Sequence, residues 1–241
     1  MKHPILLALG AGLLVLLVAF AMPLWHMGRG GAALAPGSAG AEQGLPWKVR
    51  AAPDGTLRVF GLVLGHDTLA DTQARIGDGL QVALVARLGE VGALEALADP
   101  FAAGFVSGRL VLAFEVPPQT LRRWREHAPR SEPMDDGVRR FELRVGDRDE
   151  AGRSALAGLS FVPAVRLTEA DVRQRFGTPA AEVALAGGAK VLLYPAQGLA
   201  VTVGSASRGV LEYVVPRDFE ARLRAPLAAS APAASPASAP V

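Results

Sequence analysis

The chain has 241 residues, of which 50% are hydrophobic and 20% are charged, so it contains enough apolar side chains to bury a sizeable core. Its 25 Lys and Arg against 23 Asp and Glu give a net charge of +2, which does not indicate a nucleic-acid-binding protein. The absence of cysteine excludes disulfides, thiolate zinc sites, cysteine nucleophiles and a lipid attached through an N-terminal cysteine.

The first predicted element is a hydrophobic helix. No charged or strongly polar side chain occurs from Ile5 to Met22, and Trp25 follows as an interfacial aromatic residue. A helix of this length spans about 27 Å, which is close to the thickness of a bilayer's hydrocarbon core. We therefore expect a transmembrane anchor over residues 1–27, in contact with the membrane through residues 5–25. The body would then be periplasmic on a bacterial inner membrane.

A cleaved signal peptide is the alternative interpretation of this segment. The sequence Ala19-Phe20-Ala21 has the small-x-small pattern that signal peptidase recognises. The apolar run is longer than an ordinary signal-peptide core and continues past this site, which favours the anchor. Both interpretations place the rest of the chain across the membrane, and cleavage near Ala21 would release it into the periplasm.

Two low-complexity segments flank the predicted folded body. Residues 28–44 are mostly Gly, Ala, Pro and Ser, so we expect a flexible stalk. Residues 225–241 are almost entirely Ala, Pro and Ser without a charge, so we expect a disordered tail.

A pattern at residues 68–77 recurs at residues 168–177. Each copy begins with Thr-x-x-Asp, in which the threonine hydroxyl can cap a helix while the acid interacts with the helix dipole. Each copy ends at a glycine, Gly77 or Gly177, where a left-handed C-cap is expected. The pattern therefore predicts two short helices.

Two further blocks continue the similarity. Residues 81–86 match 182–186, and residues 107–117 match 207–216, again about one hundred positions apart. Three matching blocks in register indicate an internal duplication. We expect a first α+β repeat over 45–130, a connecting strand and loop over 131–158, and a second repeat over 159–224.

The strands follow from β-like segments between turn residues. In the second copy these segments predict an antiparallel meander: 182–185, 190–194, 199–203 and 209–215. Residues 93–98 have helical propensity but occupy the place of the second strand, so we predict a strand. Other expected strands cover 56–64, 139–145 and 159–165, a charged loop covers 147–154, and closing helices cover 118–127 and 217–224.

The expected fold class is therefore α+β. It combines an N-terminal transmembrane helix with a tandem duplication of a unit in which a short helix precedes an antiparallel three- to four-stranded meander and a closing helix. The unit resembles the small outer-membrane assembly lipoproteins of the SmpA/OmlA type, and also the repeats of β-lactamase-inhibitor proteins. The residues that carry the resemblance are Thr68, Asp71, Arg75 and Gly77, and Thr168, Asp171, Arg175, Phe176, Gly177 and Pro179.

The resemblance implies non-enzymatic protein binding in the cell envelope, through the sheet face or its edges. The chain departs from these lipoproteins because it lacks their lipidated cysteine and carries the unit twice. A role in assembling outer-membrane barrels is therefore not implied.

The sequence predicts no catalytic, cofactor-binding or metal-binding residues. His66 beside Asp67 lacks a nucleophile motif, and His127 suits a helix C-terminus. The acidic clusters at 135–136 and 147–150 lack the spacing of a calcium loop, which favours solvated loops.

Two tryptophans have alternative interpretations. The cluster Arg122-Arg123-Trp124-Arg125 could bind phosphate or lipid headgroups, but helical periodicity favours Trp124 packing on the sheet while the arginines face water. Trp47 is either a lid over the edge of the core or an exposed contact, and the sequence does not decide between them.

These observations predict a membrane-anchored envelope protein that acts as a non-catalytic scaffold or adaptor. An unidentified envelope protein is the expected partner, and no small-molecule substrate is indicated. One alternative is an enzyme acting on envelope material with Asp67, Asp71 or Glu115 as acid and base. Another is a secreted periplasmic binding or inhibitor module.

Overall fold

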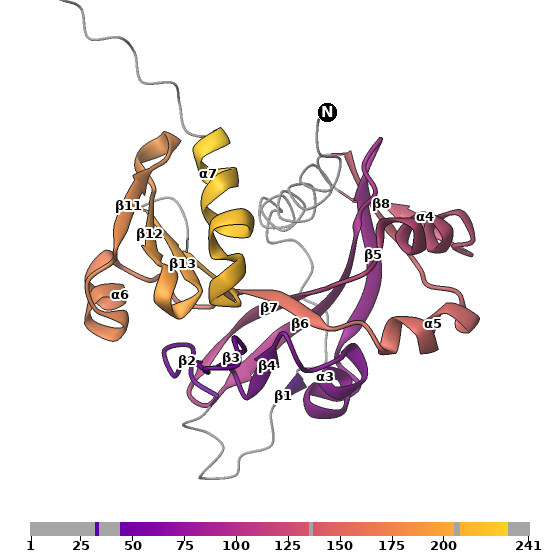
Figure 1. Ribbon diagram of the computed structural model, residues 1–241, viewed down its shortest axis with the longest axis horizontal. Coiled ribbons are helices and arrows are strands. Elements are labelled where there is room, and N and C mark those ends of the chain that lie inside the picture. The colour runs from indigo at the N-terminus through magenta and orange to yellow at the C-terminus, as the bar shows by residue number, and fades with distance from the viewer. Residues whose placement is uncertain (1–31, 34–43, 135–136, 205–207, 231–241) are drawn as a thin grey trace, which may run out of the picture.

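The computed structural model describes residues 32–33, 44–134, 137–204 and 208–230, which form an α+β fold with a mostly antiparallel sheet (Figure 1). The predicted anchor over 1–27 lies outside the described residues, as do most of the predicted stalk and residues 231–241 of the predicted tail. Within the described part of the chain, no helix is long and apolar enough to cross a membrane.

The large sheet has the strand order β11-β12-β13-β14-β10-β7-β6-β5-β9-β8, and β1 pairs with β6. Its strands are β1 Ala32–Ala33, β5 Gln81–Arg87, β6 Ala93–Ala103, β7 Val106–Phe114, β8 Ser131–Pro133, β9 Val138–Phe141, β10 Leu156–Pro163, β11 Ala181–Ala184, β12 Lys190–Tyr194, β13 Leu199–Val203 and β14 Val210–Val214. The meander β11 to β14 is antiparallel, as predicted.

Strand β10 joins the two halves of this sheet. It pairs antiparallel with β7 on one side and with β14 on the other. The two segments predicted as repeats therefore share one continuous sheet, a point that the sequence left open. Figure 1 shows β11 to β13 at one end of the molecule and β5 and β8 at the other.

The two capped helices form where the sequence places them. They are α3 Leu69–Ile76 and α6 Glu169–Phe176, and in each the threonine hydroxyl accepts from the backbone of the acid while the acid accepts from the threonine backbone. The prediction for their ends is only partly right. Gly77 and Gly177 have φ of 87° and 85°, but their ψ of −166° and −162° differs from that of a left-handed helical residue. Glycine tolerates this region of φ and ψ because it lacks a Cβ.

Removing one of these caps should have a modest effect. Thr168→Ala removes the hydroxyl that accepts from the Asp171 backbone amide and is expected to lower the free energy of unfolding by about 1 kcal/mol. Urea denaturation measures this, with Thr168→Ser as the matched variant that keeps the hydroxyl. Equal losses in the two variants would contradict a capping role.

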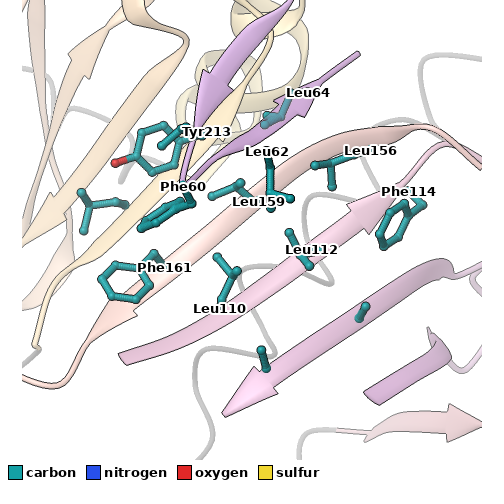
Figure 2. Close-up of a cluster of buried hydrophobic side chains, with 14 of the residues drawn as sticks. Phe60, Leu62, Leu64, Leu110, Leu112, Phe114, Leu156, Leu159, Phe161 and Tyr213 are labelled. Atoms are coloured by element: carbon teal, nitrogen blue, oxygen red, sulfur yellow. The ribbon is translucent and has the colours of Figure 1, made fainter. Parts of the chain in front are cut away.

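The strand predicted over 56–64 is broken, and this prediction is wrong. Two strands form instead, β3 Leu57–Val59 and β4 Leu62–Leu64, and with β2 Arg50–Ala51 they make a separate small sheet. Phe60 between them is 2% exposed and adopts φ of 54°, which is unusual for a residue with a side chain. Its ring packs against Phe161, Phe101 and Tyr213, with centroid distances of 5.1, 5.7 and 5.9 Å, so burial in this aromatic cluster stabilises the turn. Figure 2 shows the Phe60 ring between Phe161 and Tyr213.

The main core lies between one face of the large sheet and the elements that cover it. Leu110 and Leu112 of β7 and Leu159 and Phe161 of β10 belong to it, together with side chains of the small sheet (Figure 2). Helices α3 and α6 also contribute buried side chains to this core.

The region between the predicted repeats differs from expectation. The strand predicted over 139–145 ends at Phe141, and the charged loop predicted over 147–154 is helix α5 Val145–Gly152, so that prediction is wrong. Ala151 is fully buried, and α5 packs against α3, which explains a helix in a charged segment. The strand predicted at 93–98 is confirmed within β6.

The closing segments also differ from each other. Helix α4 Pro118–Glu126 has proline in its first turn, as predicted, and buries Leu121 and Trp124 in the main core. The second closing segment comprises η4 Pro216–Asp218, the π-helix η5 Glu220–Arg224 and α7 Ala225–Ser230, and it packs on the other face of the sheet.

Two predictions for the low-complexity segments are wrong where the structure describes them. Residues 225–230 are helical rather than disordered because Leu227 joins an apolar cluster with Phe219 and Leu223. Residues Ala32 and Ala33 of the predicted stalk pair as β1 with Phe101 and Ala102 of β6.

Candidate functional site

An apolar cavity of about 180 Å³ lies where α6 meets the ends of β7 and β10. We call it the Trp47 pocket, and the residues that define it here are Trp47, Phe105, Val165, Leu167, Arg175 and Phe176. Phe105 lies in the turn between β6 and β7, and Val165 follows β10. Side chains that are distant in the sequence therefore converge on one cavity.

Trp47 forms a wall of this pocket. The Tyr213 hydroxyl donates a hydrogen bond to the Pro46 carbonyl at 2.8 Å, which fixes the chain immediately before Trp47. The Trp47 ring packs against Phe105 at 5.7 Å between centroids, and the Arg175 guanidinium lies 4.2 Å from the centre of the Trp47 ring. The half-buried tryptophan thus covers the edge of the core and also faces the cavity.

The rim of the Trp47 pocket is unusually apolar for a surface. The side chains of Phe105 and Val165 are 79% and 65% exposed, which places them among the most exposed large hydrophobic residues of the described chain. Exposed apolar side chains beside a cavity are typical of interaction sites, because binding removes them from water.

Contacts with the sheet hold α6 in place below this rim. Phe176 packs on Tyr194 of β12 at 5.9 Å, and the Tyr194 hydroxyl donates to the Gly177 carbonyl at 3.1 Å. Arg173 of α6 forms ion pairs with Glu169 of the same helix and with Glu182 of β11, and the hydrogen bond from Arg173 lowers the pKa of Glu169. These contacts fix the position of Arg175.

The arginines near the ends of the two capped helices have different partners. Arg75 of α3 lies 3.6 Å from the buried carboxylate of Asp67 and donates to the Gly61 carbonyl. The position one hundred residues after Asp67 is Leu167, which lines the Trp47 pocket. No carboxylate of the described residues lies within ion-pair distance of Arg175, whose charge acts on Asp171 only at longer range.

The carboxylates proposed for an enzyme do not form a common site. Asp67 accepts from the Val63 amide and pairs with Arg75, whereas Asp71 belongs to the helix cap, where Thr68 lowers its pKa. Glu115 is 70% exposed and faces Arg222. None of the three lines the Trp47 pocket or the second cavity, a space of about 270 Å³ beside α3 and α5.

The other candidate residues that the structure describes take part in packing, an ion pair or a helix rather than in a common site. Trp124 is 1% exposed and packs in the core, while Arg123 pairs with Glu150, which confirms the packing interpretation of this helix. Residues 135–136 lie outside the described chain, and the acidic cluster at 147–150 belongs to α5. The described residues contain no group of three side chains placed to hold a metal ion.

Sequence reasoning missed two buried carboxyl groups. Glu95 of β6 and Glu212 of β14 are 6% and 5% exposed, and one oxygen of each has no hydrogen-bond partner among the described residues. Burial raises the pKa of Glu95 to about 8 and that of Glu212 to about 7. The available signal was a single glutamate flanked on both sides by apolar residues, within 93–98 and within 210–214.

These two glutamates do not form an acid/base pair. Each alternates along its strand with residues of the main core, so both face the opposite side of the sheet. Their strands β6 and β14 are separated by β7 and β10, which places them about 14 Å or more apart at the usual strand spacing. That distance is too large for the two groups to act on one bond.

No protein family, curated protein or solved structure matches the chain.

Proposed function

We propose that this chain is a non-catalytic envelope protein that acts as a scaffold or adaptor and binds a protein partner at the Trp47 pocket. The observation that carries the proposal is the exposed pair Phe105 and Val165 at the rim of an apolar cavity. Burying one large apolar side chain contributes roughly 1.5–3 kcal/mol, so this rim and cavity can supply the centre of an interface.

The size of the cavity favours a protein partner over a small-molecule ligand. Its volume of about 180 Å³ is below the range of roughly 300–1,000 Å³ that is usual for small-molecule sites. A space of this size accommodates one large side chain from a partner, with the exposed rim contacting the residues around it.

We further propose that the chain is a tandem duplication held at the membrane by residues 5–25. Support for the duplication comes from the two identical capping boxes and from the meanders that follow α3 and α6 and end beside β10. Support for the anchor comes from the uncharged run between Ile5 and Met22. The alternative is cleavage near Ala21, which intact mass of the mature protein distinguishes.

Photo-crosslinking in the native envelope tests the proposed function. A benzophenone amino acid at position 105 is expected to give a discrete heavier adduct, because this side chain would be buried by the partner. The matched control is position 88, since Leu88 is 93% exposed at the other end of β6 and does not line the pocket. If position 105 yields no adduct, or if position 88 yields the same one, the proposal is wrong.

A further inference from the structure

Each capped helix carries an arginine at the same position, Arg75 or Arg175, but among the described residues only Arg75 has an acidic partner within ion-pair distance. In the first, Asp67 pairs with Arg75 and also accepts from the Val63 amide, so the ion pair ties α3 to the small sheet. In the second, leucine occupies the matching position, and Arg175 is the one charged side chain of a described pocket lining that is otherwise apolar except for Ser107. The second site thus contains the cation without its acid.

From this difference we infer that Arg175 binds a carboxylate of the partner, supplied by a peptide segment that also inserts a large apolar side chain into the Trp47 pocket. The inference rests on the proposed function and specifies the chemistry of its ligand. The ligand carboxylate takes the place that Asp67 occupies in the first helix.

The properties of Arg175 suit this role. An arginine side chain offers parallel N–H donors that match the two oxygens of a carboxylate. Stacking on Trp47 at 4.2 Å restricts the guanidinium without using all of its donors. The flat face of the tryptophan therefore orients the cation toward a ligand in the pocket.

The same observations disfavour a fatty acid or phospholipid as the ligand. This cavity has a volume of about 180 Å³, which is too small for a long acyl chain. A peptide needs only one side chain in the cavity and can cover Phe105 and Val165 with its neighbours. The inference therefore commits to a peptide, and lipid binding becomes an outcome of the test.

The first measurement uses adduct formation at position 105 in the full chain. Arg175→Gln is expected to reduce the adduct about tenfold because the ligand carboxylate loses its charged partner. Leu167→Asp should have the same effect, since it supplies an internal acid like that of the first helix. The matched control is Arg224→Gln, because Arg224 pairs with Glu220 on a segment that packs on the other face of the sheet.

The second measurement compares two peptides of identical sequence, acetyl-Gly-Ser-Gly-Leu-Phe with a free carboxylate and with a C-terminal amide. The detergent-solubilised full chain is expected to bind the carboxylate about tenfold more tightly, and Arg175→Gln should remove the difference. Dodecanoate serves as the lipid probe and should compete weakly.

Each outcome separates this inference from the proposed function. If Arg175→Gln leaves the adduct unchanged while Phe105→Ser abolishes peptide binding, the carboxylate inference is wrong and the apolar interface stands. Equal affinity for the two peptides, or binding of neither at millimolar concentration, also contradicts the inference. If dodecanoate competes as strongly as the peptide, the ligand of the pocket is a lipid and not a peptide. If the chain with the photoreactive residue at position 105 and no other substitution gives no adduct, the proposed function itself is wrong.

Discussion

Replacing Glu95 with glutamine should stabilise the protein at pH 8 by an amount on the order of 4 kcal/mol and leave its stability at pH 4 nearly unchanged. Glutamine has almost the shape of a protonated glutamate but cannot ionise. Because burial raises the pKa of Glu95 to about 8, the native state of the original protein must either keep the proton or bury a charge.

The direction of the pH dependence follows from proton binding. In the unfolded chain the pKa of this carboxyl is near the ordinary glutamate value of 4.5, so between pH 4.5 and about 8 the folded state holds the proton that the unfolded state has released. The folded state binds more protons in this window, and the free energy of unfolding therefore falls as pH rises. Glu212→Gln should act in the same direction up to about pH 7, with a smaller effect.

Urea denaturation at half-unit intervals from pH 4 to pH 8 measures both variants. The control is Glu115→Gln, which alters a carboxylate that is 70% exposed and should leave the pH dependence unchanged. An unaltered slope in Glu95→Gln would mean that Glu95 is not protonated in the native state.

Replacing Phe161 with alanine should lower the free energy of unfolding by about 3–5 kcal/mol. The side chain is fully buried, and its ring packs against Phe60 at 5.1 Å and Phe101 at 6.4 Å. Phe161 also lies on β10, which pairs with β7 and β14. Both halves of the sheet should therefore lose stability together.

Hydrogen exchange read separately in β5 and β12 tests this expectation, since these strands lie on opposite sides of β10. The matched control is Phe105→Ala, which removes the same side chain at a position that is 79% exposed and should change stability by less than about 0.5 kcal/mol. Separate unfolding transitions for the two strands would contradict a single core shared across β10.

Local sequence signals predicted the elements that depend on local chemistry. The Thr-x-x-Asp pattern located both helix starts, and comparison of the repeats correctly assigned 93–98 to a strand despite its helical propensity. The break at Phe60 could not be predicted, because its positive φ is stabilised by rings from three distant segments. Helix α5 depends in the same way on packing against α3.

The candidate site was only partly accessible from the sequence. Trp47 stood out as a possible contact, but the exposure of Phe105 and Val165 follows from the turn and strand end that present them. The difference between Asp67 and Leu167 is visible in the aligned repeats. The sequence alone does not show that this difference matters. The structure does, because Arg75 contacts Asp67 and Arg175 has no equivalent acid among the described residues.

The most direct test of this account is the yield of the position 105 adduct in Leu167→Asp, compared with that of the unchanged chain. An internal aspartate beside Arg175 should occupy the guanidinium and suppress capture of the partner, while thermal unfolding shows that the variant remains folded. Undiminished capture by a folded Leu167→Asp chain would show that the free charge of Arg175 plays no part in recognition.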